Sequence, residues 1–287
     1  MTGALIEDAP GALARPARSR RAANGPLIAG LVMLVLLLVG IVAGPWLVPF
    51  DPLRVDFAIA LQPPSLTHWF GTDNLGRDVL ARTLSAGRVD LQIALVCVAL
   101  PFLVGSVAGA VAGYFGGIVD RVISGVVDIL WAFPFYVLVI AIVGTLGPST
   151  GNLYLAFTLV VWISFARIVR GEVLVVREIE YVQAARMLGF SHARIILGHV
   201  LPNAIAPALV FAMADVVLTI LGITALSFLG LGVQPPTPEW GIMIADGRNF
   251  IFDAWWISTF PGLAIVYTGI TFTLIGDGLD TLLRPKG

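Results

Sequence analysis

Two carboxylates, Asp128 and Asp215, lie inside long apolar stretches of this sequence. An ionisable side chain within a membrane-spanning helix costs about 2.5–3.5 kcal/mol on insertion scales, so each carboxylate must face a partner, a cavity or water. For Asp215, near the middle of its stretch, two interpretations stay open: contact with the ammonium group of a ligand, or a hydrogen bond between helices. For Asp128, near the end of its stretch, we prefer a structural role.

Three histidines and one cysteine complete the residues with metal-binding or nucleophilic chemistry. His192 and His199 are spaced to share a helix face, but no cysteine or carboxylate beside them completes a tetrahedral set, so we expect no metal site. Cys97 lies in an apolar stretch and is expected to be a small core residue. The sequence has no G-x-x-x-x-G-K-[S/T] phosphate loop and no paired Ser and His in its apolar stretches. We therefore expect a chain that is not an enzyme and binds no cofactor itself.

A polar loop around residue 190 has a helical pattern of its own. Residues 180–188 are good helix formers on balance, and Gly189 follows them as a residue that can take the left-handed conformation ending a helix. Ser191 would cap a second short helix, which Pro202 would end. A short rigid helix moves as a body, so this element could transmit force from a soluble partner to a membrane bundle. An amphipathic helix resting on lipid headgroups is the alternative.

The first helix of this loop has side chains that suit a protein contact. Ala184 and Ala185 lack bulk and would permit close approach of another protein. Tyr181, Met187 and Leu188 would supply apolar anchors around them, as in a helix set into a groove.

Long apolar stretches are the elements that must position these residues. Of the 287 residues, 58% are hydrophobic and only 12% are charged, a composition typical of an integral membrane protein. A hydrocarbon core about 30 Å thick needs roughly 20 apolar residues in a helix. We expect an all-α membrane protein of about six transmembrane helices, at residues 27–48, 91–114, 122–146, 153–169, 204–231 and 257–274.

Charge predicts the orientation of these spans. With the N-terminus in the cytoplasm, the segments on that side hold 12 of the 17 Lys and Arg residues, as the positive-inside rule requires. The net charge of −1 argues against a nucleic-acid partner and leaves membrane lipid as the expected surroundings. The expected segments are a cytoplasmic tail at 1–26, the first helix at 27–48, an extracytoplasmic loop at 49–90, a five-helix core at 91–283 with a cytoplasmic loop at 171–202, and a cytoplasmic tail at 284–287.

The cytoplasmic loop follows a spaced pattern of residue types. It contains Gln183-Ala184-Ala185, three residues, Gly189, nine residues, His199, one residue and Leu201-Pro202. This pattern closely resembles the loop E-A-A-x3-G-x9-I-x-L-P of permease subunits in ATP-binding-cassette importers. Gln183 stands where that signature has Glu, and His199 stands where it has Ile. The resemblance implies a loop that couples the permease to an ATPase, through Tyr181, Gln183, Ala184, Ala185, Arg186, Leu188, Gly189 and His199.

Five separated segments extend the resemblance over residues 27–283. They are similar to the second permease subunit of dipeptide and oligopeptide importers, at Phe70–Asp73 with Gly76–Asp78, Ala184–Arg186 with His199–Asn203, Leu226–Gly232, Ala254–Trp256 with Phe260–Gly262, and Gly276–Leu279. This resemblance implies a type I importer permease fold with a cytoplasmic coupling helix, in the bacterial cytoplasmic (inner) membrane.

The same resemblance implies partners and a transport cycle. The partners are a second homologous permease, two subunits or domains that bind ATP and Mg, and an extracytoplasmic solute-binding protein. ATP closes the paired ATPases, the coupling helix passes that movement to the spans, and a central cavity alternates its opening to translocate a di- or oligopeptide. Alternatives are nickel, glutathione or another small solute in the same machinery, and an ion-coupled secondary transporter, for which we detect no internal repeat.

Overall fold

The computed structural model describes residues 20–283, and the regular elements in this range are helices. The expected tail at 284–287 and residues 1–19 of the expected N-terminal tail lie outside the described residues. The α-helices are α1 (Arg20–Leu47), α2 (Val79–Phe115), α3 (Gly117–Trp131), α4 (Phe135–Leu146), α5 (Thr150–Val176), α6 (Glu180–Met187), α7 (His192–Ile195), α8 (Leu201–Ala204), α9 (Ala206–Phe228), α10 (Trp240–Gly247) and α11 (Trp256–Leu283).

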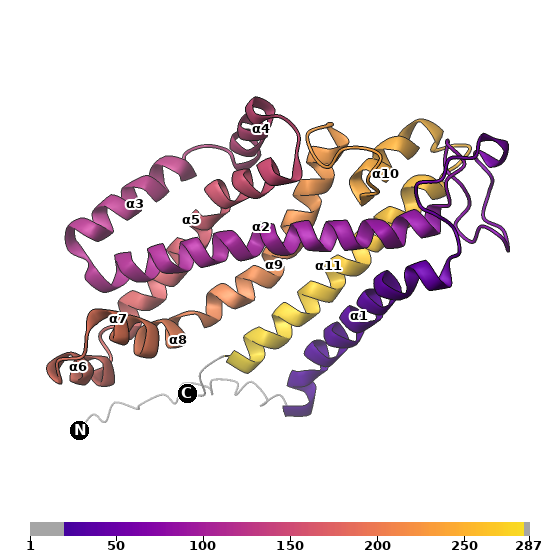
Figure 1. The fold of residues 1–287 in the computed structure, drawn as a ribbon. Coiled ribbons are helices and arrows are strands. Elements are labelled where there is room, and N and C mark those ends of the chain that lie inside the picture. Colours follow the sequence, from indigo (N-terminus) through magenta and orange to yellow (C-terminus); the bar gives the residue numbers. More distant parts are fainter. Residues whose placement is uncertain (1–19, 284–287) are drawn as a thin grey trace, which may run out of the picture.

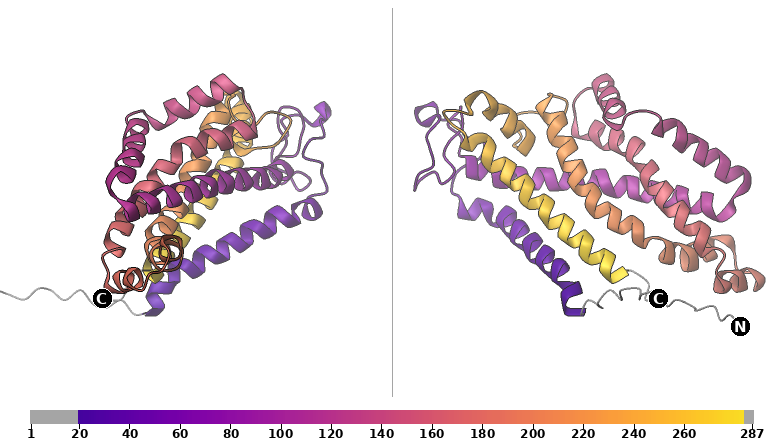
Figure 2. Two further views of the ribbon diagram at one scale, coloured as in Figure 1. Left: turned by 60° about the vertical axis from the view of Figure 1, so that its left-hand side comes forward. Right: turned by 180° about the vertical axis from the view of Figure 1, so that it is seen from behind.

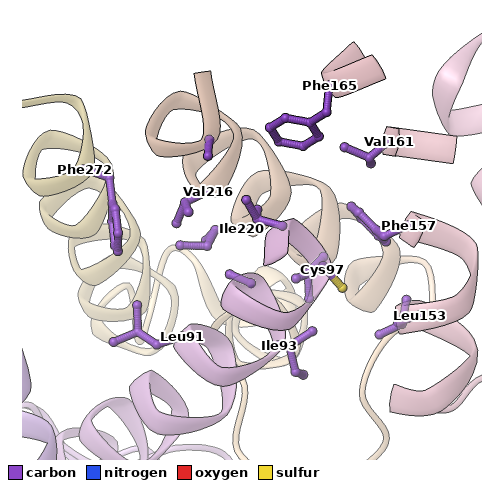
Figure 3. Close-up of a cluster of buried hydrophobic side chains, with 14 of the residues drawn as sticks. Leu91, Ile93, Cys97, Leu153, Phe157, Val161, Phe165, Val216, Ile220 and Phe272 are labelled. Carbon is purple, nitrogen blue, oxygen red and sulfur yellow. The ribbon is translucent and has the colours of Figure 1, made fainter. Parts of the chain in front are cut away.

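Five long helices, α1, α2, α5, α9 and α11, form the body of a bundle (Figure 1). α2 and α5 pack along each other, α1 lies beside α11, and α9 contacts both α2 and α11. Apolar side chains from α2, α5, α9 and α11 meet in the core, where Cys97, Phe157 and Val216 are buried (Figure 3). The expectation that Cys97 is a core residue is confirmed.

Glycines spaced four residues apart on α2 allow α2 and α5 to approach closely. A Cβ atom at Gly105 would lie 2.3 Å from the carbonyl oxygen of Trp162, and a Cβ atom at Gly109 would lie 2.4 Å from that of Ala166. Small residues at a helix interface let two backbones meet in this way. The contact fixes the register of α5, and therefore the position of the loop that follows it.

Four described helices, α1, α2, α9 and α11, are long and apolar enough to cross a membrane, and α3 with α4 would make a fifth span if the bent pair is one. α5 has 27 residues and is about 40 Å long, but it is not among these helices and carries Arg167, Arg170 and Glu172. The expected six spans therefore exceed the four or five that length and composition support. The difference lies in the third and fourth expected spans.

The third expected span, at 122–146, is wrong as a continuous helix. α3 ends at Trp131, α4 begins at Phe135, and the two helices meet at an angle of 85°. Pro134 lies at the break in an extended conformation and starts α4. Proline disfavours helix at the residue before it and has no backbone N–H to donate, which explains why the chain turns here.

The second expected span begins too late at residue 91, because α2 begins at Val79. Asp78 caps the helix, and its side chain accepts a hydrogen bond from the backbone N–H of Ala81 at 2.7 Å. The first turns of α2 are polar yet buried, with Arg82 and Asp90 almost fully covered. The expected loop at 49–90 is therefore shortened to residues 48–78.

The bundle has two distinct ends. α6 and α7 lie at one end, with the C-terminal end of α2, whereas residues 48–78 and α10 lie at the other (Figures 1 and 2). The N-terminal end of α1 and the C-terminal end of α11 point toward the end that carries α6. The loop expected to couple and the loop expected outside are thus separated by the length of the bundle.

Candidate functional site

The helix predicted at residues 180–188 is present as α6, and a turn at Gly189 follows it. α6 spans Glu180–Met187, and Gly189 follows with φ +76°. The backbone N–H of Phe190 donates to the carbonyl of Ala185 at 3.2 Å, which closes the helix end. A Cβ atom at Gly189 would meet nothing within 4 Å, so the left-handed backbone, and not crowding, favours glycine there.

The second helix of the loop begins as predicted and ends differently. Ser191 precedes α7, and its hydroxyl accepts a hydrogen bond from the backbone N–H of Arg194 at 3.4 Å. The helix does not stop at Pro202, because a π-helical segment at Ile196–Val200 leads directly into α8, where Pro202 occupies the first turn. The chain therefore stays helical past Pro202, as far as Ala204.

One face of α6 packs against the rest of this chain, and the other face is exposed. Val182 and Ala185 point inward, and Ala185 is only 5% exposed, so its small side chain serves packing within this chain. The expectation that both alanines receive another protein is wrong for Ala185, whereas Ala184 is exposed. The side chains of Met187 and Leu188 protrude, with exposed fractions of 90% and 74%. α6 therefore presents an apolar tip at the end of the molecule.

The predicted coupling loop begins later than the expected residue 171, because α5 extends to Val176, and residues 177–202 are tied to the C-terminal end of α2. The guanidinium of Arg186 lies 4.6 Å from the centre of the Tyr114 ring, and the Tyr114 hydroxyl lies 3.0 Å from Nδ1 of His192. Arg177 donates from Nη1 to the carbonyl oxygen of Gly113 at 2.6 Å. Sequence reasoning missed Tyr114, Arg177 and His192 as members of this contact, because no local pattern pairs α2 with a loop so far along the chain.

The remaining predicted coupling residues hold the loop together or lie on its surface. Tyr181 is exposed and donates from its hydroxyl to the carbonyl of His199 at 3.4 Å. The same carbonyl accepts a hydrogen bond from Nδ2 of Asn203 at 2.6 Å, and the His199 ring stacks near Phe190. Gln183 donates to the carbonyl of Glu178 at 3.0 Å. Within residues 20–283 no group of three or more His, Cys, Asp and Glu residues is placed to hold a metal.

A buried ion-pair network marks the opposite end of the molecule, and sequence reasoning missed it. Nε of Arg77 lies 2.6 Å from Asp73, and Nη2 of Arg77 lies 3.4 Å from Asp246 of α10. Arg82 approaches the same Asp73 at 3.5 Å. Burial raises the pKa of Asp246 above its ordinary value of 3.8, although Arg77 opposes that rise. The network joins the 48–78 loop to α2 and α10.

The two carboxylates of the apolar stretches, Asp128 and Asp215, have different surroundings. Asp128 forms an ion pair with Nη2 of Arg167 at 2.6 Å, and the same guanidinium lies 4.6 Å from the centre of the Trp131 ring. Asp215 is 7% exposed, and its Oδ2 atom has no hydrogen-bond partner among the described residues. Asp215 also lines a cavity of about 450 Å³ between α4, α5 and α9. The structural role preferred for Asp128 agrees with its ion pair, and residues 20–283 form no helix-to-helix hydrogen bond with the Oδ2 atom of Asp215.

Comparison with known proteins identifies the family. Residues 105–286 match the family described as binding-protein-dependent transport system inner membrane component, and residues 18–64 match the N-terminal TM domain of oligopeptide transport permease C. A probable D,D-dipeptide transport system permease protein of Escherichia coli (strain K12) is 42% identical over 259 residues, which cover 90% of this chain and 87% of the relative.

Two further relatives have similar coverage. A dipeptide transport system permease protein of Alkalihalophilus pseudofirmus is 41% identical, over 92% of this chain and 86% of the relative. A glutathione transport system permease protein of Pectobacterium atrosepticum is 38% identical, over 90% of this chain and 86% of the relative. The expected all-α permease fold and the expectation of a non-catalytic subunit, with ATP hydrolysis on separate ATPase subunits, are confirmed. The chain therefore belongs to the binding-protein-dependent transport system inner membrane components, the permease subunits of ATP-binding-cassette importers.

Proposed function

We propose that this chain is one of two permease subunits in an importer that moves dipeptides and oligopeptides across the bacterial cytoplasmic membrane by alternating access. The peptide class is supported by the names of the relatives and by the match of residues 18–64 to an oligopeptide permease domain. The importer contains a second homologous permease, two ATPase subunits or domains that bind ATP and Mg, and an extracytoplasmic solute-binding protein. No phosphate loop in this sequence would serve the ATPase role.

One observation carries the coupling role: α6 presents Met187 and Leu188 to the outside while the same loop contacts the end of α2. An apolar tip on a short helix is suited to a groove on a soluble partner. The contact with Tyr114 offers a route by which movement of that partner reaches a long membrane helix.

The coupling residues then take distinct roles. Residues that face the ATPase are Tyr181, Gln183, Ala184, Arg186 and Leu188, all of which are exposed. Ala185, Gly189 and His199 keep the shape of the loop, through close packing, the left-handed turn and a carbonyl that accepts two hydrogen bonds.

A cytoplasmic N-terminus is the orientation that this role requires. The first turn of α1 lies toward the end of the bundle that carries α6 (Figure 2). By sequence, the segments predicted to lie on the cytoplasmic side hold 12 of the 17 Lys and Arg residues. In vesicles that contain the permease without its ATPase, a cysteine that replaces Met187 should react with a membrane-impermeant maleimide only when the vesicles are inside-out. The native Cys97 is buried and should not react. Reaction in right-side-out vesicles would contradict the orientation.

The coupling role is tested at Gly189, in the complete importer reconstituted into liposomes. A left-handed backbone costs a residue with a Cβ atom about 1–2 kcal/mol, and a β-branched residue is least tolerant of it. Gly189→Val should lower peptide uptake about tenfold while ATP hydrolysis continues. Gly189→Asn is the matched control, because asparagine tolerates this conformation, and it should retain most uptake. Uptake by the valine variant equal to that of the wild type would contradict the proposal.

Glutathione, a γ-linked tripeptide, is the second candidate substrate, because one relative with 38% identity is a glutathione permease. The solute-binding protein that co-purifies with this chain distinguishes the two candidates. Its affinity for α-linked dipeptides and for glutathione, measured by calorimetry, should favour the α-linked dipeptides. Exclusive binding of glutathione would replace the first candidate by the second.

A further inference from the structure

A cavity of about 450 Å³ lies where the break between α3 and α4 faces α5 and α9. This volume falls in the range of about 300–1,000 Å³ that is typical of small-ligand pockets. Six aromatic residues contribute to the wall: Trp131, Phe133, Phe135, Tyr136, Phe157 and Phe211. Phe157 and Val161, which also belongs to the wall, lie on α5 facing α9 in Figure 3. The turn at Pro134 is what brings the α3 and α4 aromatics to one site.

A single carboxylate, that of Asp215, contributes to this aromatic wall. Its residue is 93% buried, and Oδ2 is without a hydrogen-bond partner in the described part of the chain. No ion pair to Asp215 is formed by residues 20–283, whereas Asp128 is neutralised by Arg167. Burial of an unpaired polar group costs free energy that a partner would recover, so the site is built for a group that donates hydrogen bonds.

The lining of the cavity selects the class of that partner. Hard metal cations such as Ca²⁺ require six to eight oxygen ligands, and one carboxylate among aromatic rings does not supply them. An organic ammonium group fits better, because it donates hydrogen bonds to a carboxylate and is attracted by the faces of aromatic rings. Ser164 and Thr219, which carry hydroxyl groups, also line the cavity.

We propose that this cavity receives the ammonium group of the transported peptide, with Asp215 as its counter-ion and the aromatic wall around its side chains. The proposal rests on the proposed function, because it takes a peptide as the substrate. The peptide N-terminus and a lysine side chain both carry a primary ammonium group, and either could bind Asp215. In both cases the permease itself would contribute to selectivity, in addition to the solute-binding protein.

The test measures peptide binding to the permease directly. The importer without its solute-binding protein is placed in nanodiscs, and binding of radiolabelled alanyl-phenylalanine and of N-acetyl-alanyl-phenylalanine is measured. Asp215→Asn should weaken binding of the free dipeptide at least tenfold, whereas Asp215→Glu should retain it. The acetylated dipeptide should bind the wild type as weakly as the free dipeptide binds the asparagine variant. N-acetyl-alanyl-lysine distinguishes the sources, because it binds only if a side-chain ammonium is accepted.

Asp277→Asn is the matched control, because Asp277 is exposed on α11 and does not line the cavity. It should bind the free dipeptide as the wild type does. Equal binding by the wild type and Asp215→Asn, or no binding by the wild type, would overturn the proposal. If the asparagine variant fails to assemble, the proposal is tested by competition between small ligands and the dipeptide for the wild-type importer. Phenethylammonium should displace the dipeptide and 2-phenylethanol should not, and equal displacement by both would also overturn the proposal.

ATP-dependent uptake separates this proposal from the proposed function. Uptake is measured with the solute-binding protein present. If the wild-type importer takes up peptide but Asp215→Asn binds the dipeptide as the wild type does, the proposed function stands and only the role of the cavity is refuted. A wild-type importer that takes up no peptide refutes the proposed function.

Discussion

Substitution of Gly109 by alanine tests the close contact between α2 and α5. The new Cβ atom would lie 2.4 Å from the carbonyl oxygen of Ala166 and 3.0 Å from the backbone nitrogen of Arg170, both of which are main-chain atoms that cannot rotate away. Ordinary contacts begin at 3.4 Å, so the helices must separate by about 1 Å. Overpacking of this kind costs about 1–3 kcal/mol.

Gly171→Ala is the matched control, because Gly171 lies on α5 with nothing within 4 Å of the added Cβ atom. Both substitutions gain the same helix propensity, about 0.8–1 kcal/mol, so the difference between the two variants isolates the clash. Chains of 150–250 residues lose about 2–4 °C in melting temperature per kcal/mol. The Gly109 variant should therefore melt at least about 2 °C below the Gly171 variant.

The assay is thermal unfolding of the purified permease in detergent, followed by the fluorescence of its tryptophans. Uptake by the reconstituted importer should fall in parallel for Gly109→Ala, because α5 leads directly into the coupling loop. Equal melting temperatures for the two alanine variants would refute the inference that backbone contact sets the spacing of α2 and α5.

Two further predictions concern the ends of the molecule. Met187→Asp should leave the melting temperature of the isolated permease unchanged, because the side chain is 90% exposed, but should reduce co-purification of the ATPase about tenfold; normal recovery would argue against α6 as the contact. Burial raises the pKa of Asp246, so the folded protein binds the proton of this carboxyl group more tightly than the unfolded chain does. Proton binding therefore stabilises the fold as the pH falls toward 4, and this stabilisation is lost as the pH rises through the pKa of the folded state. Asp246→Asn should remove this pH-dependent stabilisation, so the melting temperature of the wild type relative to the variant should rise when the pH is lowered from 7 to 4. A constant difference would contradict a raised pKa of Asp246.

Local signals were sufficient to predict the local structure of residues 180–195. Helix formers, the left-handed residue Gly189 and the capping residue Ser191 all act within a few residues of their own position, so the sequence alone indicates helix, turn and helix. The contact of this loop with Tyr114 could not be predicted in the same way. It joins α2 to residues far along the chain, and only the packing of α5 on α2 brings them together.

Hydropathy gave wrong bounds for helices in which polar residues are buried or a proline interrupts an apolar stretch. The start of α2 contains Arg82 and Asp90, which indicate a loop by composition, but the fold buries both. Hydropathy also averaged over Pro134, so two helices were counted as one span, although the proline itself was a visible signal. For Asp215 the sequence left two roles open, because the choice depends on what the neighbouring helices offer.

The length of α2 has a mechanical consequence. Its 37 residues form one helix about 55 Å long, held by the ion-pair network at its first turns and in contact with the coupling loop at its last. A pivot of about 5° at the anchored end of such a helix displaces the other end by about 5 Å, roughly one helical turn. In the proposed coupling role, a displacement the size of one side chain at the loop end of α2 therefore corresponds to only a slight tilt at its anchored end.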